Sequence, residues 1–87
     1  MQRPRSNPGE RLRARRVSLG LVLRDVERAS VNVARELRNP AFILPASRLH
    51  DIEVKGVVPS IHRLYTLTRV YEGELREFLS WYGIPRK

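Results

Sequence analysis

Apolar residues recur along most of this chain at spacings of three and four, which is the period of an α-helix with one buried face. The clearest stripe predicts a helix from about residue 21 to residue 38. Asn39-Pro40 ends it, because proline disfavours helical geometry in the residue before it. A weaker pattern predicts a helix over residues 9–19, with Gly20 as its C-terminal stop. The stripe of the longer helix consists of Val22, Val26, Ala29, Val33 and Leu37.

Three further helices are predicted after Pro40. The first covers residues 46–55 and ends at Gly56, the second opens at Pro59-Ser60, and the third covers residues 74–82. No segment of useful length alternates apolar and polar residues as a strand does. The sequence therefore predicts an all-α fold of five short helices around one core. The residues expected to face inward from the last two helices are Ile61, Leu64, Leu67, Val70, Leu75, Phe78, Leu79 and Tyr82.

Two apolar groups have two interpretations each. The connector over residues 40–45 holds Phe42-Ile43-Leu44, and such large apolar side chains are costly to leave in water. This run is either a lid on the core, which we favour, or a loop that docks a partner. The aromatic residues Phe78, Trp81 and Tyr82 either pack the last helix, which we again favour, or form a dimer surface.

The net charge of +8 on 87 residues favours a polyanionic partner, because each neutralised phosphate releases a counterion. Lys occurs only at Lys55 and Lys87, and Arg suits forked recognition of phosphates and guanine edges. A general preference for Arg over Lys in the source proteome explains the scarcity of Lys equally well. It does not explain the net positive charge. Residues 1–8 predict a flexible basic arm, residues 9–84 one domain, and residues 85–87 a tail or the start of a linker.

Several function classes are disfavoured. Without cysteine there is no disulfide framework and no thiolate metal site, and His50 and His62 do not have the spacing of a metal pair. Ser47, His50 and Asp51 lie too close along one helix to provide the geometry of a catalytic triad. The longest apolar run, residues 41–44, is too short to span a bilayer, and no secretory signal is present. We therefore expect a cytoplasmic protein that is not an enzyme and that has no cofactor, metal or small-molecule site.

An ordered set of residues over positions 9–82 resembles the helix-turn-helix core of the lambda repressor and Cro-like (XRE) DNA-binding family. The resemblance implies a transcriptional regulator that binds double-stranded DNA, as a homodimer on paired half-sites, through a recognition helix over residues 46–55 in the major groove. It is carried by Gly9-Glu10-Arg11-Leu12-Arg13, Arg16, Gly20-Leu21, Val26, Ala29, Ser30, Leu49-His50-Asp51-Ile52-Glu53, Pro59-Ser60, Leu64 and Leu67.

The resemblance also implies roles for individual residues. Arg16 is expected to pair with Glu53 and thereby set the angle of the recognition helix. Asp51 has an open alternative: it accepts from a cytosine amino group, or it pairs with Lys55 one helical turn away. The expected base contacts are Ala46, Ser47, Arg48 and Asp51, and the expected phosphate contacts are Arg3, Arg5, Arg24, Lys55, Ser60 and Arg63.

Four features depart from the family pattern. Leu23 replaces a frequent Gln, Lys55 replaces a glycine, and Arg15 stands at a common core position, where its stem would lie on the core and its head reach water. The link between the second and third helices is longer than the usual tight turn by about a dozen residues.

Two rival functions remain open. One is a protein-interaction module (an antitoxin or adaptor) whose contact surface would be Phe42-Ile43-Leu44 and Trp81-Tyr82. The other is a nonspecific nucleic-acid binder that uses the basic arm and the first helix.

Overall fold

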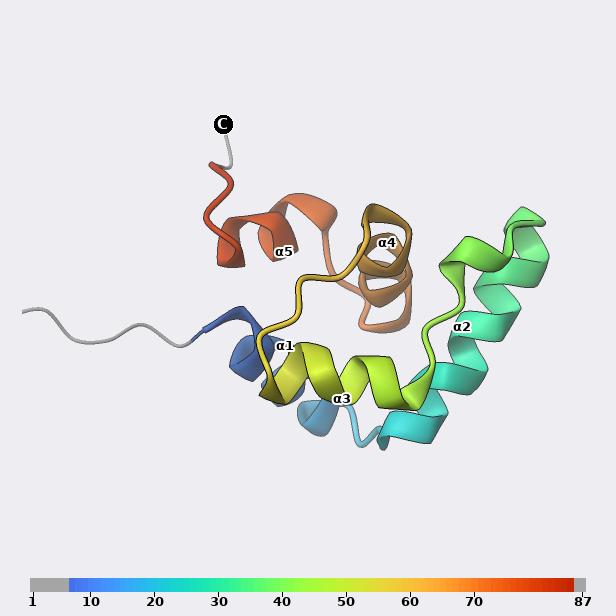
Figure 1. The fold of residues 1–87 in the computed structure, drawn as a ribbon, viewed down its shortest axis with the longest axis horizontal. Coiled ribbons are helices and arrows are strands. Elements are labelled where there is room, and N and C mark those ends of the chain that lie inside the picture. Colours follow the sequence, from blue (N-terminus) through green and yellow to red (C-terminus); the bar gives the residue numbers. More distant parts are fainter. Residues whose placement is uncertain (1–6, 86–87) are drawn as a thin grey trace, which may run out of the picture.

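A computed structural model describes residues 7–85, and over this range the chain forms five α-helices, one short 3-10 helix and no β-strand. The predicted all-α fold class is therefore confirmed. The helices α4 and α5 lie across the core from α3, and α2 runs along one side of the molecule (Figure 1). The elements are α1 (Pro8–Ser18), α2 (Leu23–Leu37), η1 (Pro40–Phe42), α3 (Ala46–Val54), α4 (Ile61–Val70) and α5 (Leu75–Trp81).

One core receives side chains from every α-helix and from the connector between α2 and α3. Its centre is apolar, and two aromatic rings, Tyr71 and Phe78, close it on the side of α5. This arrangement explains why no single short helix needs to be stable alone, since each buries its apolar face against the others. The buried cluster consists of Leu12, Val26, Leu44, Leu49, Ile52, Leu64, Leu67, Tyr71 and Phe78.

The second helix begins at Leu23, later than the stripe predicted. The Asp25 carboxylate accepts a hydrogen bond from the Val22 amide at 2.9 Å, which caps the helix there. The predicted buried face is confirmed at Val26 and Val33. It is wrong at its two ends, because Val22 and Leu37 are exposed. Val22 precedes the first turn and Leu37 is the last helical residue, so neither reaches the core. Ser30 and Ala34 complete the buried face instead.

The connector packs onto the body of the domain, which supports the lid interpretation. Leu44 is fully buried, and its amide donates to the Ser30 hydroxyl at 2.9 Å. Phe42 and Ile43 are half-buried. The Phe42 ring meets the rings of His62 and Tyr65 edge-on, with centroids 5.0 and 5.7 Å away. The connector leads from α2 to α3 along the chain and packs against both α2 and α4, and Leu44 is its most deeply buried residue.

The last two helices differ from expectation mainly at their first residues. Ser60 caps α4 by accepting from the Arg63 amide at 3.1 Å. Ile61, expected to face inward, is exposed, because the first residue of this helix projects beyond the core. In α5 the Trp81 ring stacks on Phe78 with centroids 4.7 Å apart, as expected if the aromatic residues serve packing.

Candidate nucleic-acid interface

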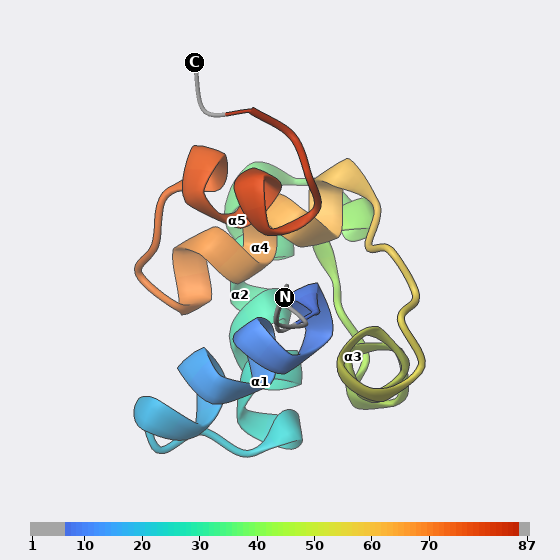
Figure 2. The same cartoon turned by 90° about the vertical axis from the view of Figure 1, so that its left-hand side faces the viewer.

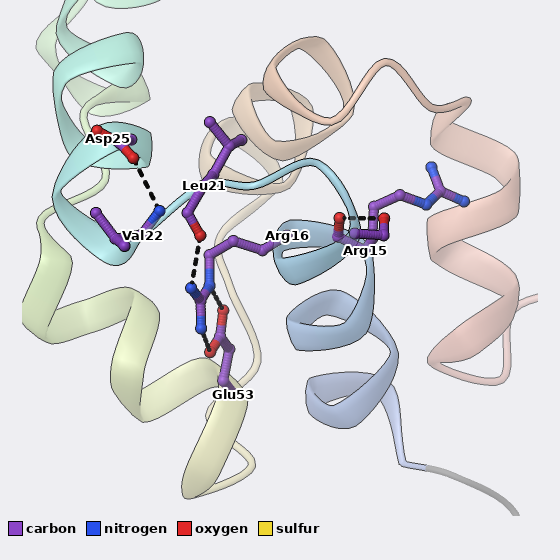
Figure 3. Close-up of polar contacts among 7 residues, drawn as sticks. Arg15, Arg16, Leu21, Val22, Asp25 and Glu53 are labelled. Atoms are coloured by element: carbon purple, nitrogen blue, oxygen red, sulfur yellow. Dashed lines mark hydrogen bonds and ion pairs between the residues drawn. The ribbon is translucent and has the colours of Figure 1, made fainter.

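A buried ion pair joins α1 to α3. The Arg16 guanidinium donates from Nε and one terminal nitrogen to the two Glu53 carboxylate oxygens, at 2.7 and 2.9 Å (Figure 3). The two side chains are only 10% and 3% exposed, so water screens the attraction weakly. The hydrogen bonds to Glu53 raise the pKa of Arg16 further, and the guanidinium stays charged. This is the pair that the resemblance implied.

The same guanidinium also reaches the start of α2. Its other terminal nitrogen donates to the Leu21 carbonyl at 2.9 Å, in the loop between α1 and α2 (Figure 3). Arg16 therefore fixes three elements at once: its own helix, the entry to α2, and α3 through Glu53. A planar fork with several donors is suited to this role, whereas a lysine ammonium is not.

Gly9 allows α1 to approach α3 closely. A Cβ atom at this position would lie 2.5 Å from the Ile52 carbonyl oxygen and 2.6 Å from that of Glu53. Such distances are incompatible with any side chain unless the backbone moves. Gly9 and Arg16 thus both hold α1 against the C-terminal part of α3, at Ile52 and Glu53.

The opposite face of α3 is open. The helix lies at the edge of the molecule, away from α4 and α5 (Figures 1 and 2). Of the four residues expected to contact bases, Ser47 and Arg48 are exposed, and Ala46 and Asp51 are partly exposed. The inward face is formed by Leu49, Ile52 and Glu53. All four candidate residues are therefore at least partly accessible to a partner of α3.

Asp51 lies among three cationic or potentially cationic side chains on this helix. Its carboxylate is 3.7 Å from Lys55 Nζ, 3.9 Å from Arg48 and 3.8 Å from His50 Nδ1. The intrahelical alternative for Asp51 is thus present in the free protein. Contacts of this length on an exposed face contribute little to stability, so Arg48 and Lys55 remain free to turn to another anion.

The residues expected to contact phosphate differ in their exposure and in the hydrogen bonds that they already make. Arg24 and Lys55 are exposed, and Ser60 caps α4. Arg63 is half-buried, and its Nε donates to the Ile43 carbonyl at 2.9 Å, which ties α4 to the connector. Arg63 therefore has a structural contact that spacing along the helix did not reveal. Arg3 and Arg5 lie outside the described residues.

The first amide of α3 is already occupied. The Ala46 N–H donates to the Glu27 carboxylate at 3.2 Å, so α2 caps α3 across the connector. Free amides at a helix N-terminus commonly bind phosphate, but this one is already bonded within the protein. No local pattern indicated the contact, because Glu27 lies 19 residues before Ala46.

Two arginines outside α3 have partners that the sequence did not reveal. Arg15 donates to Glu77 at 2.9 Å and lies 5.6 Å from the centroid of the Phe78 ring, so its head meets α5. The side chain keeps 27% exposure, so this head is partly open to water, and the sequence did not reveal that it is also paired. Arg69 donates to Glu36 at 2.9 Å and links α4 to α2.

Within residues 7–85, no helix is both long and apolar enough to cross a membrane. The same residues contain no group of three or more His, Cys, Asp or Glu side chains placed to hold a metal ion.

Comparison with curated proteins finds a partial similarity. A segment of 52 residues, 59% of this chain, is 38% identical to a histidine–tRNA ligase of Orientia tsutsugamushi (strain Ikeda). The matched segment makes up 12% of the ligase, so the chain spans a small part of that relative's length. No protein-family model matches the chain. No solved structure matches it either.

Proposed function

We propose that this chain is a sequence-specific DNA-binding domain of the lambda repressor-like (XRE) type that regulates transcription. The α3 helix would enter the major groove and present Ser47, Arg48 and Asp51 to base edges. Arg forks onto guanine, Ser donates or accepts, and Asp accepts from a cytosine amino group. The observation that carries the proposal is the bidentate Arg16–Glu53 pair, which holds α3 with these residues outward.

A recognition helix must be rigid, because loss of its orientation removes the hydrogen-bond geometry on which base discrimination depends. Contacts at both ends of α3 support this requirement: Gly9 and Arg16 meet it at Ile52 and Glu53, near its C-terminal end, and Glu27 binds its first amide. A protein that merely attracts nucleic acid by charge needs no such support. The arrangement therefore favours specific over nonspecific binding.

The charge of the chain supports the same proposal. Its excess of eight positive charges would attract any phosphate backbone and supply the part of the affinity that does not depend on sequence. Arg48 and Lys55 on α3, with Arg24 at the start of α2, are exposed and would neutralise phosphates beside the groove. Arg63 keeps its terminal nitrogens for such a contact while its Nε binds Ile43.

The partial similarity to a histidine–tRNA ligase supplies a second candidate, an RNA-binding module. That relative acts on tRNA, and the matched part is a small fraction of it. Because A-form RNA has a deep and narrow major groove, a helix such as α3 cannot read it in the same way. We place this candidate second for that reason.

The test is a selection of bound sequences from a random pool of double-stranded DNA, followed by titration of the enriched duplex. Enrichment of a defined motif, bound far more tightly than a scrambled duplex at the same salt concentration, is the expected result. Bulk tRNA serves as the competitor. If tRNA displaces the enriched duplex as well as unlabelled duplex does, the RNA-binding candidate replaces ours. If the pool yields no motif, binding is nonspecific or the fold serves protein contacts.

A further inference from the structure

A hollow of about 350 Å³ lies between the end of α2, the connector, and the first turns of α4 and α5. We call it the connector groove. It extends across α4, because α4 packs against both α2 and α5, whereas those two helices do not pack against each other. The connector, where the chain departs from the family pattern, forms part of its wall. The lining residues are Leu37, Phe42, Ile61, His62, Tyr65 and Leu75.

The apolar stripes of two helices end in this groove without a cover. Leu37 in α2 is 40% exposed and Ile61 in α4 is 59% exposed, although the spacing of apolar residues predicted that both face inward. The half-buried Phe42 ring adjoins them and meets the rings of His62 and Tyr65 edge-on. Single exposed apolar residues are common on proteins, but a contiguous group marks an interaction surface.

Exposed arginines adjoin the groove on all three helices. Arg38 directly follows the groove residue Leu37 at the end of α2, and Arg76 is the second residue of α5. On α4, the guanidinium carbon of Arg69 lies 5.9 Å from the centroid of the Tyr65 ring. Positive charge therefore stands next to the apolar surface on each side.

The acidic residues beside the groove do not balance these arginines. Glu36 is already bound by Arg69 at 2.9 Å, which leaves Glu74 beside Arg38 and Arg76. None of the six lining residues is Arg, Lys, Asp or Glu. The groove thus has an uncharged floor and a rim with an excess of positive charge. A second copy, with the same rim, is repelled, whereas a partner whose apolar residues are flanked by acidic ones is attracted.

The size of the groove suits one helix of a partner and not a folded domain. Six residues line it, whereas a stable interface between two domains uses about 20–30 residues a side. An amphipathic helix presents apolar side chains at i, i+3, i+4 and i+7, within about 10 Å along its axis. Such a row of side chains can enter a hollow of 350 Å³.

The groove is separate from the face proposed to bind DNA. No residue of α3 lines it, and α3 lies across the core from α4 and α5 (Figures 1 and 2). A helix bound in the groove therefore leaves the outward face of α3 uncovered.

From these observations we infer that the connector groove binds an amphipathic helix of another protein, with Asp or Glu beside its apolar stripe. Leu37 and Ile61 supply the apolar contacts, and Arg38 and Arg76 attract the acidic flanks. The binding itself does not depend on DNA. Its regulatory meaning rests on the proposed function: the chain would hold DNA through α3 and bring the partner to that DNA through the groove.

Peptide selection tests the groove directly. The full chain is the bait, and the probe is a displayed library of helical peptides with Leu fixed at i, i+3, i+4 and i+7 and with Glu, Gln or Lys at the flanking positions. The selected peptide is titrated by fluorescence anisotropy against Leu37→Ser and Ile61→Ser, with Val17→Ser as the control, since Val17 is 54% exposed on α1. Arg76→Gln tests the rim, and Arg13→Gln, exposed on α1, is its control. Circular dichroism checks that each variant is folded.

The selected peptides should carry Glu on their flanks. Leu37→Ser and Ile61→Ser should each weaken binding about tenfold, because each removes an apolar contact, and Val17→Ser should leave it unchanged. Arg76→Gln should weaken binding about threefold at low salt, and Arg13→Gln clearly less. If no peptide is selected, if Lys-flanked peptides are selected, or if the groove variants bind as tightly as the control, the inference is wrong.

Two further measurements address other occupants. Sedimentation of the chain alone tests a second copy: self-association that Leu37→Ser abolishes would mean that the groove holds another copy, which overturns the inference. Titration of the peptide with the selected duplex at saturation should give an unchanged affinity, and displacement by the duplex would overturn it too. If the DNA pool yields no motif while the peptide binds in the groove, the inference stands and the proposed function fails. A motif without a groove-binding peptide does the reverse.

Discussion

The Ser30 hydroxyl in α2 accepts a hydrogen bond from the Leu44 amide at 2.9 Å, and both residues are completely buried. The same hydroxyl donates to the Glu27 carbonyl at 2.6 Å, so donor and acceptor are both used. The long connector departs from α2 after Leu37 and returns to it at this point. Because Glu27 also caps α3, one segment of α2 positions both the end of the connector and the start of α3.

Ser30→Ala should therefore destabilise the fold by about 1–3 kcal/mol, since the Leu44 amide would be buried without an acceptor. Ser18→Ala is the matched control. Its hydroxyl also donates to a carbonyl three residues back, but at an exposed site, so its loss should change stability by less than about 0.5 kcal/mol. Urea unfolding measures both. Equal stability of the two variants would mean that the Ser30–Leu44 contact is not an anchor.

The helices could be predicted because their signals are local. The period of three and four, Gly20 and Asn39-Pro40 mark where helices run and end, and these depend on neighbouring residues only. The errors lie at helix ends. Val22 and Ile61 fit the apolar period, yet each precedes the turn at which its helix meets the core. Whether a terminal residue is buried depends on the elements that pack beside it. The spacing of apolar residues within one helix carries no information about those elements.

The candidate site could be predicted only where a known family pattern existed. The Arg16–Glu53 contact follows from that pattern, since the two residues lie 37 positions apart and nothing local connects them. The Glu27–Ala46, Arg63–Ile43 and Arg15–Glu77 contacts were missed for the same reason. Ile43 lies in the connector and Ala46 directly follows it. The chain departs from the family pattern in this region, so the resemblance could not supply the first two contacts.

Glu53→Ala should destabilise the fold by about 3 kcal/mol, because it leaves the Arg16 guanidinium buried without its counter-charge. Glu77→Ala removes the partner of Arg15 in a more exposed pair and should cost about 1 kcal/mol or less. The comparison by urea unfolding separates burial from charge, since each variant removes one carboxylate. Similar losses in the two variants would show that the Arg16–Glu53 pair does not stabilise the fold more than a surface pair does.

The connector should show a gradient of stability effects that follows burial. Leu44→Ala removes a fully buried side chain and should cost about 3 kcal/mol, with a cavity left behind. Phe42→Ser should cost about 2 kcal/mol, because its ring is half-buried against His62 and Tyr65. Thermal unfolding followed by circular dichroism measures both. A Phe42→Ser protein as stable as the parent would instead favour a docking role for this loop.

Gly9→Ala should destabilise the fold by about 1–3 kcal/mol through overpacking, although alanine is the better helix former. The added methyl would meet the Ile52 and Glu53 carbonyl oxygens and push α1 away from α3. Gly83→Ala is a useful contrast, since open space surrounds that glycine and its penalty would come from a φ of +89° alone. In Gly9→Ala, and not in Gly83→Ala, amide hydrogen exchange should also become faster in α3. Unchanged exchange in α3 would show that α1 does not hold it.

Arg48→Ala should separate base recognition from attraction by charge. If Arg48 forks onto a guanine, its loss should lower affinity for the selected duplex by about 1–3 kcal/mol and relax the preference at one base position.

Arg76→Ala is the control, because it removes the same charge from an exposed site on α5, a helix that does not pack against α3. It should weaken binding slightly and equally for every sequence. Replacing Arg3 and Arg5 by Ala should likewise weaken binding to all sequences and reduce its dependence on salt. Repeating the random-pool selection with each variant makes the comparison. An Arg48→Ala variant that selects the parent motif unchanged would mean that α3 is not the recognition helix.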